Sequence, residues 1–370
     1  MRAWKLLSFF GSLIAFGFYL AEVQPQHRKK VLAASLILAV VAIWVFVYGT
    51  GAKGFSWTLF QSTVSSLDPQ WLLASLFFSY GTYLVRALRW AVLIRPLRPH
   101  PGFRNLLSAT VIGFSAVTAL GRAAEMVRPY LIASKEHVPF SSQVAAWVVE
   151  RLYDVLIALA VFGFALSQVQ GSGVALGPTL SWVLQVGGVV IGLGAAGCLG
   201  ILLAMRFRSE QIQRGILRAL KFLTAHRLAR VEQVVASFLD GVRCTKSQSA
   251  TAKLIVYTLV EWLLIAACYA CVLKAFGGVV HFSFIDVLIL MGFVSFGSLV
   301  QLPAVGGGAQ MTAVLVLTEV FAVPIEVATG LSLLLWFISF VAILPVGTLL
   351  AFHEGLTWAR IREAEGTTLA

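Results

Sequence analysis

Charged side chains are scarce in this chain: they make up 12% of its 370 residues, against about 25% in an ordinary soluble protein. Hydrophobic residues make up 59% of the chain, and the mean hydropathy is +0.88. Apolar runs in such number must be buried, and lipid is the solvent that can bury them. The composition therefore excludes a soluble enzyme and a disordered chain.

Cysteine and clustered metal ligands are also scarce. The four cysteines are too few for a disulfide scaffold, and Cys268 and Cys271 have no histidine or acid at metal-ligand spacing. The six histidines lie apart, without a Ser-His-Asp order or a nucleotide-binding glycine loop. We therefore expect no metal, no cofactor and no enzyme activity. The alternative is an integral membrane enzyme in which Glu150 and Asp154 serve as general acid and base on a lipid-linked substrate.

Basic residues are present but dispersed. The net charge is +12, and the 28 lysines and arginines lie between apolar runs, where such residues set the orientation of membrane helices. We expect no nucleic-acid partner, because the basic residues are not gathered as a nucleic-acid site requires.

Long apolar runs divide the chain into membrane helices. A spanning helix needs about 20 apolar residues, and runs of that size cover 31–49, 70–93, 143–168, 180–205, 254–276, 284–302 and 327–352. Two shorter runs, 105–120 and 309–323, each adjoin an interruption that contains glycine. These runs predict an all-α polytopic membrane helix bundle with re-entrant or broken helices and about seven to nine hydrophobic segments.

The transmembrane domain is expected at 28–352, followed by a short cytoplasmic tail at 353–370. The preceding segment 1–27 contains an apolar run at 6–20 behind two basic residues. That run fits a signal segment, a retained helix or a start-site artefact, and the sequence leaves these alternatives open.

The orientation follows from the loop 206–253, which holds ten basic residues against three acids and is therefore expected in the cytoplasm of a plasma (inner) membrane. This loop is also a candidate surface for a partner protein or an anionic lipid. If 105–120 crossed the membrane, the parity of the later spans would place the basic loop outside. We therefore predict that 105–134 is a re-entrant helical hairpin, broken near Gly121.

A second break is expected between Gln301 and Gln310, where a proline removes a helix donor and three glycines free the backbone. Two broken helices in the two halves of a chain indicate a transport site, although a plain turn between two spans explains the glycine run equally well. The predicted gating residues are Gly121, Pro303, Gly306, Gly307 and Gly308.

Ionisable residues within membrane segments cost about 2.5 to 3.5 kcal/mol each and therefore mark functional sites. Here they gather on the second span, on the predicted hairpin and at the start of the next span. The candidate headgroup-binding residues are Arg86, Arg89, Arg122, Glu125, Arg128, Glu150, Arg151 and Asp154, with Glu261 as one more intramembrane acid. Anchoring of Arg86 and Arg89 at the membrane surface is the structural alternative.

The five arginines of this set outnumber its three acids, which leaves a formal excess of two positive charges. Guanidinium groups bind phosphate bidentately, so we expect an anionic lipid or a lipid-linked phosphate as the ligand. Neutralising Arg122 or Arg128, or removing Glu150, is expected to abolish headgroup movement while leaving membrane insertion intact.

Four stretches of the chain resemble the signature of the lysylphosphatidylglycerol synthase transmembrane-region family, a flippase-like integral membrane domain. They are Arg86 to Trp90, Gly121 to Leu131, Glu150 to Asp154 and Pro303 to Gly308, in the family's order. The resemblance covers 28–352. It implies a flippase-type fold and movement of a lipid or lipid-linked headgroup between leaflets, and it does not name the cargo.

The chain departs from the family pattern in three ways. The proline that usually precedes the glycine at Gly121 is absent, and no acid follows the glycines before Gln310. The sequence stops at Ala370, so we expect no soluble aminoacyl-transferase domain and no lysyl transfer. The sequence thus predicts a lipid flippase or transporter. An integral membrane enzyme and an accessory protein of lipid or cell-envelope biogenesis are the alternatives.

Overall fold

The computed structural model describes residues 55–171, 177–208, 211, 215, 218, 225–277, 282–298, 301–302 and 306–355. Several sequence-based expectations lie outside these residues: the segment 1–27, the span 31–49, Pro303 and most of the tail 353–370. The side chain of Arg122 also lies outside the described part of the chain.

Six helices of the described chain are long and apolar enough to cross a membrane. They are α4 (Pro69–Ile94), α5 (Phe103–Leu120), α7 (Phe140–Gly171), α8 (Pro178–Phe207), α11 (Gln248–Ala275) and the helical stretch Ile325–His353. The predicted all-α polytopic membrane bundle is therefore confirmed. Apart from helices, the described residues contain one pair of two-residue strands.

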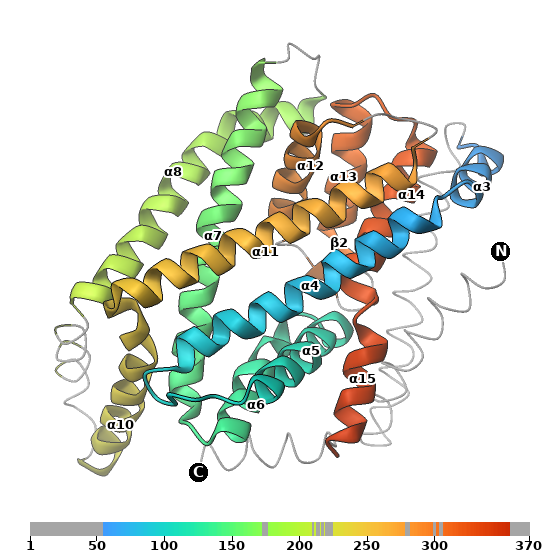
Figure 1. Ribbon diagram of the computed structural model, residues 1–370. Coiled ribbons are helices and arrows are strands. Elements are labelled where there is room, and N and C mark those ends of the chain that lie inside the picture. The colour runs from blue at the N-terminus through green and yellow to red at the C-terminus, as the bar shows by residue number, and fades with distance from the viewer. Residues whose placement is uncertain are drawn as a thin grey trace, which may run out of the picture.

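Helices α4 and α11 lie side by side through the centre of the molecule (Figure 1). Each begins at a side-chain cap, because Asp68 accepts a hydrogen bond from Gln70 N at 2.9 Å and Ser247 accepts one from Ala250 N at 3.3 Å. Helix α7 packs against α8, and α8 lies at the edge of the bundle. The central pair of α4 and α11 brings residues from both halves of the chain together.

The chain forms a helical hairpin after α4, as predicted. That this hairpin is re-entrant stays a prediction, because α5 is one of the six helices long and apolar enough to cross a membrane. Helix α5 ends at Gly121, which has a φ of 76° that favours glycine. A short 3-10 segment, η1 (Arg122–Met126), then leads into α6 (Val127–Glu136), which packs back on α5. Gly113 allows this close packing, because a Cβ there would overlap the Cβ of Arg128.

The predicted span 284–302 is not one continuous helix. Helix α12 (Phe284–Gly297) has 14 residues, so it is about 21 Å long at 1.5 Å per residue and falls short of the roughly 30 Å hydrocarbon core. The backbone then forms β1 (Gln301–Leu302) and β2 (Gly306–Gly307), in which Gln301 pairs with Gly307. The φ of Gly307 is 126°, and α13 (Gly308–Glu319) packs back on α12. The second predicted break therefore also forms a hairpin of two short helices.

The predicted span 327–352 is interrupted as well. It consists of α14 (Ile325–Trp336), a π-helical segment, η3 (Phe337–Val341), and α15 (Leu344–His353). Pro345 in the first turn of α15 has no backbone N–H to donate, which explains why the α-helical ladder changes there. Two further helices, α3 (Trp57–Ser65) and α10 (Ala225–Val242), and the 3-10 turn η2 (Arg243–Lys246) complete the described elements.

Hydroxyl side chains of α4 and α5 bind the carbonyls around the π-helical segment. Ser79 donates to Ile338 O at 3.0 Å, Tyr80 to Ala342 O at 2.6 Å, Ser115 to Ile343 O at 3.2 Å and Thr118 to Phe340 O at 3.1 Å. A broken helix at membrane depth needs such partners, because lipid offers none.

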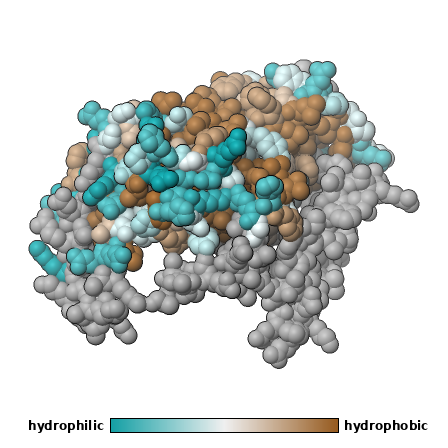
Figure 2. All heavy atoms as spheres, turned by 60° about the horizontal axis from the view of Figure 1, so that its bottom comes forward, coloured by the Kyte–Doolittle hydropathy of each residue, from teal (hydrophilic) through white to brown (hydrophobic). Residues whose placement is uncertain are grey.

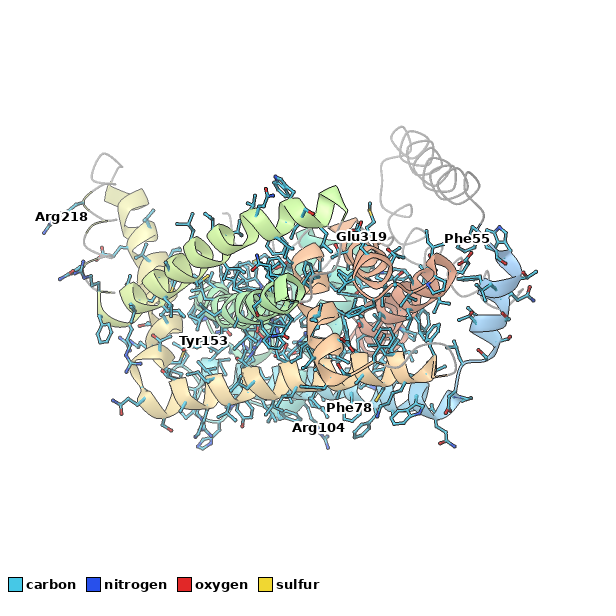
Figure 3. All side chains as sticks on the ribbon, turned by 90° about the horizontal axis from the view of Figure 1, so that it is seen from above. Phe55, Phe78, Arg104, Tyr153, Arg218 and Glu319 are labelled. Carbon is cyan, nitrogen blue, oxygen red and sulfur yellow. The ribbon has the colours of Figure 1, made fainter. Side chains whose placement is uncertain are left out.

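Seen from above, Phe55 and Arg218 lie at opposite ends of the molecule, with Tyr153 between them (Figure 3). Figure 2 brings the bottom of Figure 1 forward and shows hydrophilic residues gathered on this face, with hydrophobic residues beyond them. The connection between α4 and α5, with exposed Arg95 and Arg98, lies toward this end. The basic stretch 206–253 contains helix α10, which packs on α7, and is therefore not an open loop throughout.

Candidate functional site

A central cavity of about 380 Å³ lies between α4, α5, α7 and α11 and extends to the ends of both hairpins and to the π-helical segment. Its wall contains aromatic residues, hydroxyl groups and six charged side chains. These six are Arg86, Glu125, Arg128, Arg151, Asp154 and Glu261. Ionisable groups that share one cavity at the depth of a membrane bundle point to a functional site.

Arg89 joins three helices directly behind this wall. Its guanidinium donates through Nη2 to Glu150 Oε1 at 2.6 Å and through Nη1 to Asp154 Oδ1 at 2.6 Å. Nη1 also lies 3.1 Å from Glu261 Oε2. The side chain of Arg89 is 1% exposed. Neither Arg89 nor Glu150 belongs to the cavity lining, so this pair holds α4, α7 and α11 together from within.

Arg128 attaches the first hairpin to the same network. Its Nη1 donates to Glu150 Oε1 at 3.2 Å, and its Nη2 donates to Glu150 Oε2. The guanidinium carbon lies 4.2 Å from the ring centroid of Trp90, whose Nε1 donates to Gln143 Oε1 at 3.0 Å. Glu150 therefore binds Arg89 and Arg128 at once and positions the hairpin against α4.

Arg86 and Arg151 are the more accessible arginines of the wall. Arg86 donates through Nε to Glu261 Oε1 at 2.7 Å, and its guanidinium carbon lies 4.1 Å from the ring centroid of Phe114. Arg151 lies 2.9 Å from Asp154 Oδ2 through Nη2. Their side chains are 17% and 36% exposed, so a ligand in the cavity can reach them.

The structure brings most of the predicted site residues together. Arg86, Arg89, Arg128, Glu150, Arg151 and Asp154 form one network of ion pairs, and Glu125 lies on the wall of the same cavity. Gly121 directly precedes the 3-10 segment of the first hairpin. Gly306, Gly307 and Gly308 form the turn of the second, next to Ala309 and Gln310, which line the cavity.

Glu261 joins the network, a carboxylate that the expected excess of two positive charges did not count, while the Arg122 that it did count lies outside the described side chains. Among the described side chains, four arginines pair with the three carboxylates of Glu150, Asp154 and Glu261. Glu125 adds a fourth carboxylate to the wall. The sequence signal that Glu261 joins the ion-pair network was its position as a lone acid in the apolar run 254–276. Its partners could not be identified, because they lie on a helix that is far away in the sequence.

No group of three or more His, Cys, Asp or Glu side chains in the described part of the chain is placed to hold a metal ion. The carboxylates of the network instead accept hydrogen bonds from arginines. What the arrangement offers chemically is a polar cavity with guanidinium donors and carboxylate acceptors inside a membrane bundle.

Comparison with known proteins adds a family and one distant relative. The family model "Lysylphosphatidylglycerol synthase TM region" matches residues 31–347. Glycosyltransferase AglD of Haloferax volcanii is 24% identical over 329 residues, which are 81% of this chain and 50% of the relative. The chain therefore spans about half the length of this curated relative. No solved structure matches the chain significantly.

The relative corrects one expectation from the sequence. The prediction that the chain has no enzyme activity is wrong on this comparison, because a protein similar over most of the chain is named a glycosyltransferase. That prediction rested on the absence of known catalytic motifs. Carboxylates placed by the fold, such as Glu125 and Asp154 on the cavity wall, escape a search by motif.

Proposed function

We propose a lipid-transport function for this chain, which is a multi-pass membrane protein that belongs to the lysylphosphatidylglycerol synthase transmembrane-region family. In this proposal, the central cavity binds the phosphate-bearing headgroup of a lipid or lipid-linked molecule, and the protein moves this headgroup across the bilayer. The observation that supports this most is the presence of three arginines, Arg86, Arg128 and Arg151, on the wall of one cavity within the helical bundle. Guanidinium groups bind phosphate oxygens with paired N–H donors.

The ion pairs leave donors available for a ligand. Within the described residues, Arg86 uses Nε for Glu261, and Arg151 uses Nη2 for Asp154. A guanidinium carries five N–H donors, so a phosphate can bind both side chains without displacing their carboxylates. The carboxylates meanwhile offset the high energy of bringing arginines into the membrane.

The charge balance of the cavity bears on the kind of headgroup. Among the described side chains of the lining, three arginines face the three carboxylates of Glu125, Asp154 and Glu261. A nearly neutral wall favours a phosphodiester with one negative charge and polar groups over a multiply charged anion. Anionic membrane lipids and lipid-linked phosphates remain the ligands that we propose.

Reconstituted vesicles provide the test. The protein is inserted into vesicles that contain a small fraction of phosphatidylglycerol with a fluorescent headgroup-proximal label, and a membrane-impermeant quencher reports how much label reaches the outer leaflet. We expect wild-type protein to raise the quenchable fraction above that of empty vesicles. The Arg151→Gln variant should lose most of this increase.

The matched control is Arg98→Gln, which removes an equal charge from a side chain that is 53% exposed and lies outside the cavity. It should move the labelled lipid like the wild type. Equal rates for wild type and Arg151→Gln, with both proteins folded, would contradict a role of the cavity in headgroup movement.

A second candidate function is glycosyl transfer on a lipid-linked substrate. The name of the relative favours it, and Glu125 and Asp154 supply two carboxylates on the wall of the same cavity, which is the residue type used for acid and base catalysis on sugars. Mass spectrometry of lipids from the vesicle assay separates the two functions. A lipid of changed mass supports transfer, and an unchanged lipid in the opposite leaflet supports movement alone.

We also propose the orientation and the membrane. The excess of basic residues in 206–253 favours a cytoplasmic position for this stretch and for the C-terminus, in a plasma (inner) membrane. The same stretch is our candidate surface for a partner protein involved in lipid or envelope biogenesis. A single cysteine introduced at exposed Arg218 tests the orientation: an impermeant thiol reagent should label it in inverted vesicles and not in intact cells.

A further inference from the structure

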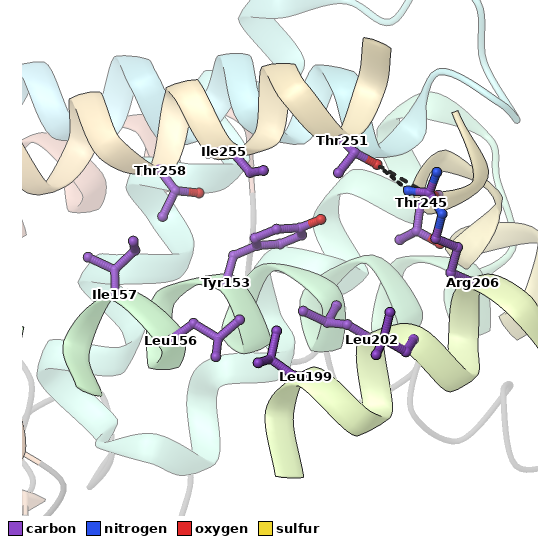
Figure 4. A pocket seen from close by; sticks show the side chains of 11 residues that line it. Tyr153, Leu156, Ile157, Leu199, Leu202, Arg206, Thr245, Thr251, Ile255 and Thr258 are labelled. Atoms are coloured by element: carbon purple, nitrogen blue, oxygen red, sulfur yellow. Dashed lines mark hydrogen bonds between the residues drawn. The ribbon is translucent and has the colours of Figure 1, made fainter. Parts of the chain in front are cut away.

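A second cavity, of about 310 Å³, lies between α7, α8, α11 and η2 (Figure 4). It shares helices with the central cavity but uses their opposite faces: Tyr153 and Leu156 of α7 line the second cavity, whereas Asp154 and Val155 line the central one. Thr258 of α11 separates the two, because it lines the second cavity and accepts a hydrogen bond from Arg89 Nη1 at 3.2 Å.

We call this second cavity the groove. Its lining is apolar along its length and polar at one end. Six aliphatic side chains form the apolar part: Leu156, Ile157, Leu199, Leu202, Leu203 and Ile255. At one end Arg206 lies beside Thr245 and Thr251 (Figure 4), and its Nη1 donates to Thr251 Oγ1 at 3.4 Å. The groove thus combines a long hydrocarbon surface with one cationic group.

Arg206 differs from the arginines of the central network. Arg86, Arg89, Arg128 and Arg151 each pair with a carboxylate, whereas no acid among the described residues forms an ion pair with Arg206. It is also the only charged residue in the lining of this groove. A cation that pairs with no acid of the described chain, at the edge of an apolar groove, favours the binding of an anion from outside the chain.

The groove is accessible from the hydrocarbon region. Only 6% of the spanning window of α8 is buried inside the molecule, against 28% or more for the other candidate spans. Leu199 and Leu203 on the rim of the groove are 49% and 53% exposed. A lipid chain can therefore enter from the side without passing through the bundle.

We propose that this groove binds one acyl chain of a glycerophospholipid whose phosphate is held by Arg206. A phospholipid matches both parts of the lining, because its chain is apolar and its phosphate is the anion that guanidinium prefers. A non-helical peptide segment in the same place would leave backbone groups without hydrogen-bond partners in lipid. The site lies outside the central cavity and does not depend on the function proposed for that cavity.

Photo-crosslinking tests the proposal with the full chain purified in a nonionic detergent. One probe is phosphatidylglycerol with a diazirine in one acyl chain, and the second is diacylglycerol with the same chains, which lacks the phosphate. Peptide mass spectrometry then locates the adducts. We expect the phospholipid to label peptides of α7, α8 or α11 that line the groove, and to do so much more strongly than diacylglycerol.

Charge variants identify the role of Arg206. Arg206→Gln should lower labelling of the groove by phosphatidylglycerol about tenfold, the effect of losing a charge-assisted hydrogen bond, while Arg206→Lys should restore part of it. The control Arg208→Gln removes the same charge from the exposed residue next to the end of α8, which does not line the groove, and should leave labelling unchanged.

A steric variant covers the case in which Arg206→Gln fails to fold. Leu202→Trp fills the apolar part of the groove and should reduce labelling there by both probes. Wild-type labelling by diacylglycerol equal to that by the phospholipid would overturn the proposal. So would Arg206→Gln labelling equal to wild type, an equal loss in Arg208→Gln, or adducts confined to other surfaces. Arg151→Gln, which alters the central cavity, should not change the labelling of the groove.

Discussion

Arg89 in α4 and Glu150 in α7 form an ion pair of 2.6 Å between Nη2 and Oε1, and their side chains are 1% and 0% exposed. Charges removed from water in this way are stable only when every partner is present. Since Glu150 also binds Arg128, its removal leaves Arg128 without the acid it pairs with among the described residues and takes one of three acid partners from Arg89.

The first prediction therefore concerns stability. Glu150→Gln should lower the free energy of unfolding by about 3 to 5 kcal/mol, as expected when one partner of a buried ion pair is lost. The measurement is the melting temperature in detergent together with the yield of monodisperse protein. Asp240→Asn, which breaks an exposed pair with Arg243, should change stability by about 1 kcal/mol or less. The sequence led us to expect that a Glu150 variant inserts normally and loses only headgroup movement; normal stability would restore that interpretation.

The second prediction tests the geometry of Arg128. Its guanidinium donates twice to Glu150 and lies over Trp90. Lysine keeps the charge but cannot form two parallel hydrogen bonds or stack as a plane. Arg128→Lys should therefore reduce stability by about 1 to 3 kcal/mol, the range for hydrogen bonds to charged groups. Arg98→Lys at an exposed position should be neutral, and equal melting temperatures for both variants would contradict this geometry.

The third prediction concerns the π-helical segment. Thr118→Val and Tyr80→Phe each remove a hydroxyl that donates to a carbonyl of the segment or of its end. A buried carbonyl left without a donor costs about 1 to 3 kcal/mol, and unfolding in denaturant measures the loss. Ser62→Ala removes an exposed hydroxyl that donates to Leu59 O within its own helix and should have little effect. Comparable losses in all three variants would show that the segment does not require these donors.

The fourth prediction concerns the second hairpin. A Cβ at Gly297 would overlap Thr312 of α13, so Gly297→Ala should destabilise the protein by about 1 to 3 kcal/mol through overpacking. Gly188 in α8 has no atom within 4 Å of a Cβ built there, and Gly188→Ala should be neutral or raise stability by up to about 1 kcal/mol through helix propensity. Melting temperatures of the two variants give the comparison, and the reverse order would mean that α12 and α13 do not pack as described.

The fifth prediction concerns pH. Burial raises the pKa of the Cys244 thiol, which lies in η2 outside the membrane helices, to about 12. In the unfolded chain the thiol ionises near pH 8.5. The unfolded state therefore binds fewer protons than the folded state between about pH 9 and 12, and stability should fall as the pH rises through this range. Cys244→Ala should remove this part of the pH dependence, and in the wild type Cys244 itself should react with a maleimide at neutral pH only after unfolding, as peptide mass spectrometry can show.

The sequence predicts those parts of the fold that depend on local pattern. Long apolar runs identify α4, α7, α8 and α11 because lipid requires about 20 apolar residues per span. The break at Gly121 is visible because glycine alone adopts its positive φ without strain.

Other features depend on contacts that spacing in the sequence does not encode. Arg86 and Glu261 are 175 residues apart, so their pairing becomes apparent only once α4 and α11 lie side by side. Pro345 could have indicated the break before α15, but the run 327–352 is apolar throughout and was therefore interpreted as one span. The short length of α12 was missed for the same reason, since the apolar run continues beyond the helix end at Gly297.

One carboxylate connects the first hairpin to the central helix pair. Glu150 Oε1 accepts hydrogen bonds from Arg89 of α4 and from Arg128 of the first hairpin. If the hairpin moved away from α4, Glu150 Oε1 could keep its hydrogen bond to only one of these two arginines. Glu150 is therefore the one acceptor that joins Arg89 of α4 to Arg128 of the first hairpin among the ion pairs of the described residues.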